Sequence, residues 1–322
     1  MTRLGYQIPN FSYPGVGAAE LFDTIARQAR EADASGFDTV LVMDHFYQLP
    51  FLGPHDAYML ECYSLLSALA RETKSVRLSS LVTGNTYRNP AVLAKTITTL
   101  DIVSNGRGQL GIGAGWFELE HTAFGIEFGT FTDRFEKLEE ALQIVVPMLR
   151  DEKVSLSGKH YTAVDIVNSP PPISRIPVMI GGGGERKTLR MVAQYGDACN
   201  VFGDAATVRR LMGVLDEHCA SMGRNPADIC RTRLGTLIVG RTMEEAQAKL
   251  SVRLGGATID SLPADMQARV KGMFIVGDAD EVGAKVQELL DAGLDGIVVN
   301  MPDAYDLDAV ALAGDVLSKV FA

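Results

Sequence analysis

The chain has 322 residues, of which 47% are hydrophobic and 22% are charged, values that are ordinary for a globular protein with a large buried core. Its formal net charge of −10 argues against nucleic acid or an anionic membrane as a partner. No apolar run is long enough to cross a bilayer, and the first residues lead into a predicted strand and not a signal peptide. The four cysteines show no CxxC spacing, so we expect reduced thiols in a cytoplasmic protein.

Short apolar runs alternate with amphipathic segments along the chain. The apolar runs predict buried strands, which span residues 4–9, 37–43, 76–82, 109–113, 177–180, 197–202, 232–239 and 296–300. The amphipathic segments predict helices, as at 18–34, where Leu21, Ile25 and Ala29 share one face. The other predicted helices span residues 57–71, 90–103, 131–149, 185–193, 206–222 and 279–290, with one more starting near 243 and a last one ending at 320.

Eight strands that alternate with helices in a chain of this length indicate a (β/α)8 TIM barrel, formed as a single domain over residues 1–322. Two segments interrupt the alternation and are expected to be irregular insertions, at 151–175, which would contain one short strand, and at 254–277. The rival architecture is a doubly wound sheet. It is disfavoured because no strand is followed by a GxGxxG turn with an acidic residue about 20 positions on.

A glycine turn, Gly181–Gly184, follows the fifth predicted strand and precedes a predicted helix. Such a turn leaves backbone N–H groups free at a helix N-terminus, and Arg186 and Lys187 add positive charge in the first turn. This combination favours a phosphate group. A tight strand-to-helix turn with solvated charges would show the same pattern, so the phosphate site stays a hypothesis at this point.

The loops after the carboxyl ends of barrel strands form the functional face of such a fold. Several polar, aromatic and glycine residues fall there: Asp44-His45-Phe46, Thr83 to Arg88, Ala114-Gly115-Trp116 and the glycine turn. We therefore expect a pocket for a flat aromatic ligand that carries a phosphate. His45 would hydrogen-bond a heterocycle or shuttle a proton there, unless the backbone alone satisfies it. Trp116, the only tryptophan, would stack on the ligand or anchor the core.

The other polar residues are interpreted as structural. His121 lies near Glu118 and Glu120 in a segment that reads as a solvated helix turn, and Arg134 would dock a helix or form a salt bridge. We expect no metal site, because no HExxH or comparable cluster occurs. Covalent hydrolysis has little support, since there is neither a Ser-His-Asp order nor a nucleophile elbow.

Five stretches together resemble the luciferase-like monooxygenase superfamily, in particular its branch of oxidoreductases that depend on the deazaflavin coenzyme F420. They are VMDHFYQ at 42–48, LVTGNTYRNPAVLAK at 81–95, LDIVSNGRGQLGIGAGWFELEH at 100–121, DRFEKLEEAL at 133–142 and IGGGGERKTLRMVAQYGDACN at 180–200. The resemblance covers nearly the whole chain. It implies an insertion-bearing (β/α)8 barrel that binds F420 or FMN, as a homodimer.

The resemblance also implies roles for particular residues. Asp44 and His45 correspond to catalytic residues beside the deazaflavin ring. Leu81-Val82-Thr83 corresponds to a bulge that backs the ring, often with a non-proline cis peptide. The other cofactor-binding residues that the resemblance implies are Asn85, Ala114, Gly115, Trp116, Gly181, Gly182, Gly183, Gly184 and Arg186.

One position departs from the relatives that oxidise sugar phosphates. Those relatives carry a catalytic glutamate where this chain has Trp116, which puts the sugar-phosphate activity in doubt. The main hypothesis is thus an F420-dependent oxidoreductase acting on an unidentified small organic substrate. The alternatives are an FMN-dependent two-component monooxygenase and a barrel that binds a flavin-like molecule without turnover.

Overall fold

The computed structural model describes residues 2–321, with the side chains of all of these except residues 268 and 269. Eight parallel strands close into a barrel, since each pairs with the next and the last pairs with the first. In barrel order they are β1 (Leu4–Ile8), β2 (Thr39–Val42), β3 (Arg77–Ser80), β5 (Gly108–Gly113), β8 (Val178–Gly181), β9 (Ala198–Val201), β10 (Cys230–Val239) and β12 (Gly296–Asn300). The predicted (β/α)8 TIM barrel is confirmed.

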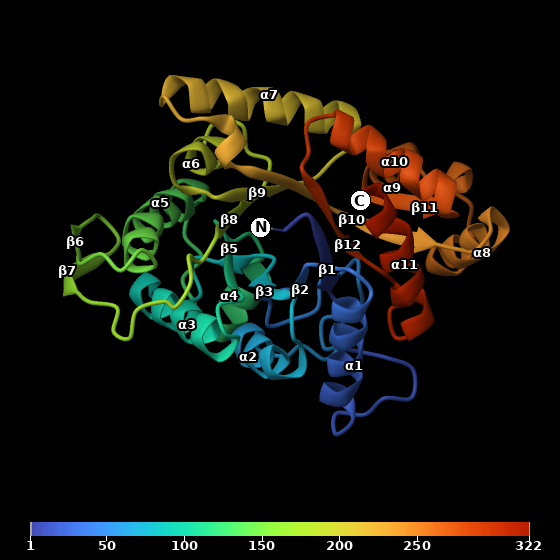
Figure 1. Cartoon of the computed structure of the whole chain (residues 1–322), viewed down its shortest axis with the longest axis horizontal. Helices are drawn as coiled ribbons and strands as arrows, with labels where there is room; N and C mark the ends of the chain where they lie inside the picture. The colour runs from blue at the N-terminus through green and yellow to red at the C-terminus, as the bar shows by residue number, and fades with distance from the viewer. Residues whose placement is uncertain (1, 322) are drawn as a thin grey trace.

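Helices surround the barrel and cover its outer face (Figure 1). They are α1 (Leu21–Ala34), α2 (Cys62–Glu72), α3 (Pro90–Val103), α5 (Phe131–Met148), α6 (Thr188–Tyr195), α7 (Ala205–Ser221), α10 (Ala279–Asp291) and α11 (Leu307–Val320). Local sequence sets where several begin. Asn89 caps α3 just before Pro90, and Thr130 forms a capping box with Asp133 at the start of α5. None of the described helices is long and apolar enough to cross a membrane.

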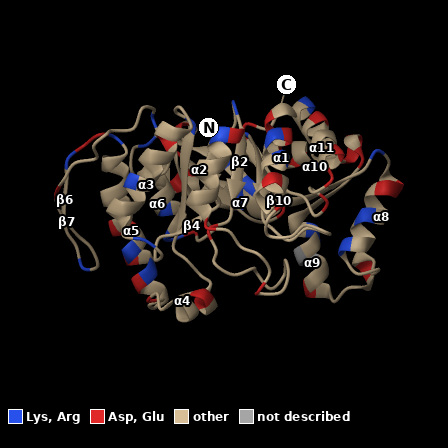
Figure 2. Ribbon diagram, turned by 90° about the horizontal axis from the view of Figure 1, so that it is seen from below, with Lys and Arg blue, Asp and Glu red and all other residues tan. Residues whose placement is uncertain are grey.

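The remaining elements decorate the barrel. The short strand β4 (Thr83–Gly84) follows β3 and pairs with β5. The helix α4 (Glu118–Phe124) follows β5, and α8 (Met243–Arg253) and α9 (Ala264–Met273) lie between β10 and α10. Both α4 and α9 lie on the side of the barrel away from the chain termini (Figure 2). That side carries the carboxyl ends of the strands. Two 3-10 turns, Pro226–Asp228 and Ile259–Ser261, complete the description.

The two predicted insertions differ in character. Residues 151–175 contain the antiparallel hairpin β6 (Val154–Ser157) and β7 (Thr162–Ile166), which agrees with the expected short strand. Its turn is held against α5, because Glu140 accepts hydrogen bonds from the backbone N–H groups of Lys159, His160 and Tyr161. The expectation that 254–277 is irregular is wrong.

Those residues contain α9 and the strand β11 (Phe274–Gly277), which pairs with the second half of β10. The strand was missed because it is short. Its pairing becomes possible only where β10 extends beyond β9: β9 pairs with Cys230–Arg233, and β11 with Thr236–Val239. Nothing in the local sequence pattern indicates that this part of β10 has a free edge.

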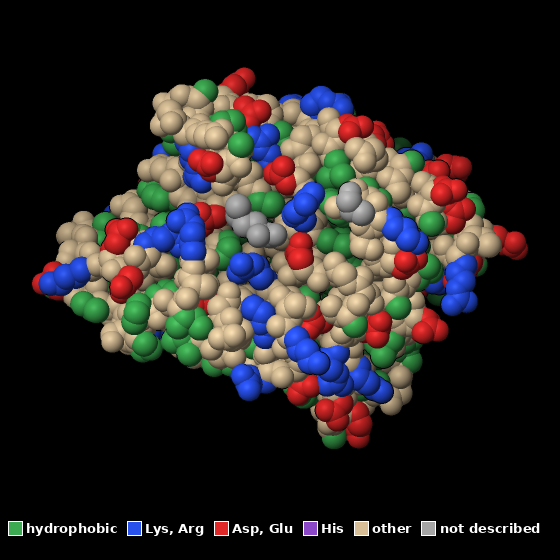
Figure 3. Space-filling view, viewed as in Figure 1, with side chains coloured by type: hydrophobic (Ala, Val, Ile, Leu, Met, Phe, Trp, Pro, Cys, Tyr) green, Lys and Arg blue, Asp and Glu red, His purple; other side chains and the backbone are tan. Residues whose placement is uncertain are grey.

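The barrel interior is filled by an apolar layer below the carboxyl ends of the strands. Leu41, Met179, Ala198 and Val298 form this layer, and Leu81 packs on it from the end of β3. A larger core lies between the strands and the helices, where the strand residues are buried on both faces, as parallel barrels require. On the face shown in Figure 3, acidic and basic side chains are interspersed.

Two neighbouring barrel strands approach each other very closely at Gly111. A Cβ at this position would lie 2.1 Å from the backbone oxygen of Ser80, which cannot move without displacing β3. We therefore expect Gly111→Ala to destabilise the fold by about 1–3 kcal/mol or more. The measurement is the midpoint of chemical unfolding.

Gly213→Ala is the matched control, because Gly213 is exposed in the middle of α7 and a Cβ there meets nothing within 4 Å. This variant should be more stable than the wild type by about 0.5–1 kcal/mol, since alanine lowers the entropy cost of forming a helix. Equal effects of the two substitutions would contradict the close approach at Gly111.

Candidate functional site

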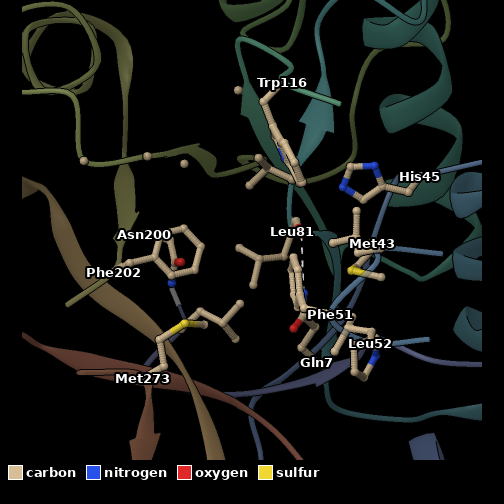
Figure 4. Close-up of a pocket in the computed structure, with 18 of the residues that line it drawn as sticks. Gln7, Met43, His45, Phe51, Leu52, Leu81, Trp116, Asn200, Phe202 and Met273 are labelled. Atoms are coloured by element: carbon tan, nitrogen blue, oxygen red, sulfur yellow. Dashed lines mark hydrogen bonds between the residues drawn. The ribbon is translucent and has the colours of Figure 1, made fainter. Parts of the chain in front are cut away.

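A cavity of about 1080 Å3 opens at the carboxyl ends of the barrel strands (Figure 4). Its floor consists of side chains from the strands, and its walls come from the loop after β2, the start of α5, the loop after β8 and the α8–α9 segment. Most residues that the sequence pointed to line this cavity: Asp44, His45, Leu81, Val82, Thr83, Ala114, Gly115, Trp116, Gly181, Gly182, Gly183 and Gly184.

Two predicted site residues do not line the cavity. Asn85 is buried behind it, and its amide nitrogen donates to the carbonyl oxygens of Gly113 at 3.2 Å and Ala114 at 3.0 Å. Asn85 therefore fixes the end of β5. Arg186 is exposed in the turn before α6. It lies outside the helix because α6 begins at Thr188, three residues later than the sequence pattern predicted.

His45 is held at the cavity by a buried carboxylate. Its Nδ1 lies 2.7 Å from Oε1 of Glu120, whose side chain has no exposed surface. The same carboxylate accepts a hydrogen bond from the Tyr87 hydroxyl and, through Oε2, one from the backbone N–H of Phe46 at 2.8 Å. Glu120 thus ties α4 to the loops after β2 and β4.

The hydrogen bonds also set the charge of this group. Burial by itself would raise the pKa of Glu120, but the hydrogen bonds from His45, Tyr87 and Phe46 hold it below its usual range. Burial and the neighbouring carboxylate raise the pKa of Tyr87 above its ordinary value, so Tyr87 stays a donor. An ionised carboxylate can only accept hydrogen bonds, and the proton of a neutral His45 therefore sits on Nδ1. Its Nε2 has no hydrogen-bond partner within residues 2–321, which leaves this nitrogen for a ligand.

The interpretation of Glu120 and His121 as a solvated helix turn is wrong. Both side chains are fully buried. His121 donates from Nδ1 to the carbonyl oxygen of Phe117 at 2.8 Å, and its Nε2 lies 2.7 Å from the hydroxyl of Thr86. Sequence reasoning missed Glu120 because the partner that buries it, His45, lies 75 residues away. The only local signal is a cluster of acidic residues with a histidine at the end of a barrel strand.

Asp44 also lies beside the cavity, but its carboxylate is already paired. The Arg88 guanidinium donates to its two oxygens at 2.6 and 3.0 Å, and Arg88 also donates to Glu61 at 2.6 Å. Burial raises the pKa of Asp44, and the charge of Arg88 opposes this. Burial would lower the pKa of Arg88, but the Asp44 carboxylate raises it overall. The two hydrogen bonds hold Asp44 and Arg88 together, and Arg88 braces the loop.

The glycine loop offers unpaired backbone donors. Gly182 takes a φ of +123°, which favours glycine, and its N–H donates to the carbonyl oxygen of Asn200 at 2.9 Å. The next two N–H groups, of Gly183 and Gly184, have no hydrogen-bond partner within the part of the chain that the structure describes. The loop leads into α6, whose Thr188 lines the cavity. Free backbone amides in a glycine loop that leads into a helix are suited to bind an anion.

Arg134 lies on the same side of the cavity and was expected to dock a helix or form a salt bridge. Its guanidinium donates to the carbonyl oxygens of Gly115 at 3.2 Å and Gly129 at 2.9 Å. No carboxylate pairs with it among the described residues. Its positive charge therefore remains available to an anionic ligand.

The floor of the cavity carries a polar network on top of the apolar layer. Asn300 donates to the side-chain oxygen of Gln7 at 3.0 Å and accepts from the hydroxyl of Thr236 at 2.9 Å. Next to it, the Leu81–Val82 peptide bond is cis, as the family resemblance implied. Val82 then packs against Gly181, where a Cβ would lie only 2.9 Å from its side chain. The bulge and the glycine loop therefore fit together only with glycine at this position.

A closed (β/α)8 barrel with an anion site and a histidine–carboxylate pair on one rim is the architecture of a cofactor-binding enzyme. Residues 2–296 match the model of the luciferase-like monooxygenase family, and the chain belongs to that family. It is 29% identical over 327 aligned residues to an F420-dependent glucose-6-phosphate dehydrogenase of Amycolatopsis mediterranei, with 94% of this chain and 93% of that protein covered.

Solved structures share the fold. A coenzyme F420-dependent tetrahydromethanopterin reductase from Methanopyrus kandleri superposes with a TM-score of 0.79 at 19% identity, covering 100% of this chain and 99% of the other. An F420-dependent secondary alcohol dehydrogenase in complex with an F420–acetone adduct gives a TM-score of 0.80 at 21% identity, with 99% of both chains covered. These likenesses establish the architecture of the barrel.

Glu120→Gln tests the carboxylate that holds His45. The substitution keeps the shape of the side chain but replaces an acceptor by a donor next to groups that donate, so we expect the free energy of unfolding to fall by about 2–3 kcal/mol at neutral pH. The measurement is denaturant unfolding of both proteins.

The difference should depend on pH. Because the pKa of Glu120 is lowered in the folded state, its stabilisation is fully present above the unfolded pKa of about 4.3 and is lost as the pH falls through the folded value. The gap between wild type and variant should therefore shrink when unfolding is repeated below about pH 4. A gap that stays constant over this range would contradict an ionised Glu120.

Proposed function

We propose that this chain is an F420-dependent oxidoreductase that transfers a hydride between the deazaflavin and a small organic substrate. The observation that carries the proposal is the pair His45–Glu120 at a cavity that also holds an anion site. The relative from Amycolatopsis mediterranei is named an F420-dependent dehydrogenase and matches over 94% of this chain. That similarity favours F420 over FMN.

The residues of the cavity fit a deazaflavin with a phosphate-bearing tail. The amides of Gly183 and Gly184 and the guanidinium of Arg134 would hold the phosphate. Arg186, which has no ion pair among the described residues, would add charge from the mouth of the loop. The bulge at Leu81–Val82 would back the ring. When bound, the cofactor supplies the hydride donor or acceptor, and the protein supplies position and proton transfer.

His45 acts as the proton carrier. When a substrate hydroxyl is oxidised, Nε2 accepts its proton, and when a carbonyl is reduced, Nε2 returns the proton to the oxygen. The ionised Glu120 at Nδ1 keeps the imidazole in the required tautomer and stabilises its charged form. Asp44 does not take part in proton transfer because Arg88 occupies both of its oxygens. It instead positions the loop that carries His45.

We do not extend the proposal to glucose 6-phosphate. Trp116 stands where the sugar-phosphate relatives are expected to carry a catalytic glutamate, and it leaves 56% of its surface exposed at the cavity. We propose further that the protein is a cytoplasmic homodimer. The four cysteines are free and buried, which suits a reducing compartment, and the resemblance to the family supports the dimer. Its mass in solution would decide between monomer and dimer.

Cofactor choice is tested by titrating the purified apoprotein with F420 and, in parallel, with FMN, followed by fluorescence. We expect tighter binding of F420. Arg186→Ala should weaken F420 binding by about tenfold, because a charge-assisted contact to the phosphate is lost. Arg209→Ala is the matched control, since Arg209 is another exposed arginine without an ion pair among the described residues but lies on α7 outside the cavity.

Tighter binding of FMN would turn the assignment to the two-component monooxygenase. Binding of neither cofactor would overturn the phosphate site itself. An equal loss in both arginine variants would show a general electrostatic effect in place of a contact at the glycine loop.

Proton transfer is tested with His45→Gln, which keeps a hydrogen-bonding side chain but cannot carry a proton. With any alcohol or ketone that the wild type converts in the presence of F420, kcat should fall by about 10²–10⁴-fold, while the Kd for F420 stays unchanged. His55→Gln is the control, because His55 lies exposed in the same loop and does not line the cavity. A variant that retains both turnover and the wild-type pH profile would exclude His45 as the proton carrier.

A further inference from the structure

The cavity has two chemically different sides. One side carries His45, the glycine loop and Arg134. The other side is an apolar wall, which we define as Phe202, Leu262, Met266 and Met273. In Figure 4, Phe202 and Met273 lie across the cavity from His45, with Leu81 between them.

The apolar wall is unusually exposed. Phe202 and Met266 each have 48% of their surface accessible. Large apolar side chains that gather at one hollow without being covered mark a binding surface, because their burial by a ligand releases ordered water. The α8–α9 segment, which supplies part of the wall, is also tied to the loop after β2, since Arg253 on α8 donates to the carbonyl oxygen of Phe51 at 3.0 Å.

Charge is scarce on this side. Among the described side chains that line the cavity, Arg253 is the only charged group next to the apolar wall, and it is exposed at the mouth. Asp44 is neutralised by Arg88, and Arg134 lies on the side of the glycine loop. The polar groups of the floor, such as Gln7 and Asn300, pair with one another. Among the described side chains of the apolar wall, a substrate phosphate or carboxylate would therefore find no set of cations.

The volume leaves room for a second molecule. At about 1080 Å3 the cavity is at the upper end of the range for small-molecule sites, about 300–1,000 Å3. If the cofactor takes the side of the bulge and the glycine loop, as the proposed function has it, the apolar wall is left for the substrate.

We propose that the substrate is an uncharged molecule with a large apolar body, which lies against the apolar wall while its reacting hydroxyl or carbonyl faces His45. The inference rests on the proposed function for the placement of the cofactor. It distinguishes this chain from a sugar-phosphate enzyme. The hydroxyl and phosphate groups of a sugar phosphate would lie against methionine and phenylalanine side chains, which cannot form hydrogen bonds with them.

The test uses the F420-loaded protein and isothermal titration calorimetry with 1-hexanol, 1-octanol and 1-decanol. Burial of each added methylene in an apolar site tightens binding about fourfold, so each step of the series should lower Kd by roughly fifteenfold. Octanoate should bind at least about tenfold more weakly than 1-octanol, because the described side chains of the wall offer its charge no partner. Glucose 6-phosphate should bind more weakly still.

The location is tested with a matched pair of methionines. Met266→Ala should weaken the binding of 1-octanol about fivefold or more, because part of the wall is removed. Met222→Ala should leave it unchanged, since Met222 is similarly exposed, at 40%, but lies at the end of α7 away from the cavity. F420 affinity should be the same in both variants.

Three results would overturn the inference: a Kd that does not change along the alcohol series, tighter binding of octanoate or glucose 6-phosphate than of 1-octanol, or equal effects of the two methionine variants. The F420 titration separates this failure from that of the proposed function. If F420 does not bind, the proposed function fails, and the same alcohol series with the apoprotein still decides whether the wall takes apolar molecules.

Discussion

The buried carboxylate of Glu120 is the interaction on which the site depends. It accepts hydrogen bonds from a histidine, a tyrosine and a backbone amide that come from two different loops. A charge without exposed surface is stable only while such partners surround it, so the loops cannot move apart without leaving it unpaired. The same carboxylate orients His45 and gives α4 a fixed place on the rim. The arrangement of the loops and the orientation of His45 therefore both depend on the hydrogen bonds of Glu120.

The rigid barrel supplies the second constraint. Its strands approach closely at Gly111, and the glycine loop packs against Val82 at Gly181, so the floor and the anion site are parts of one packed unit. An apolar layer lies below the cavity, and the polar network of Gln7, Thr236 and Asn300 lies on top of it at the floor. Variation in chemistry is then left to the loops.

The sequence was sufficient to predict features that depend on residues close to one another in the chain. The spacing of apolar residues and the positions of glycines predicted the strands and helices of the barrel. His45 and the glycine loop were singled out because they follow the ends of predicted strands. It failed where a residue depends on a distant partner. Glu120 looked solvated because His45 is 75 residues away, and no local pattern indicated that Asn85 would bind the backbone of β5. The strand β11 forms only because a neighbouring strand ends early.

The net charge of −10 argues against large anionic partners but carries no information about an anionic cofactor. The reason lies in how the anion site is built. Backbone amides at Gly183 and Gly184 provide directed positive dipoles that no titration removes and that the fold holds in place. A protein that binds phosphate mainly through its backbone needs few cationic side chains, and Arg134 can supply charge without a basic surface around it. An acidic chain can thus hold an anion on one side of its cavity and keep the opposite side apolar, because backbone amides bind the anion while apolar side chains form the other side.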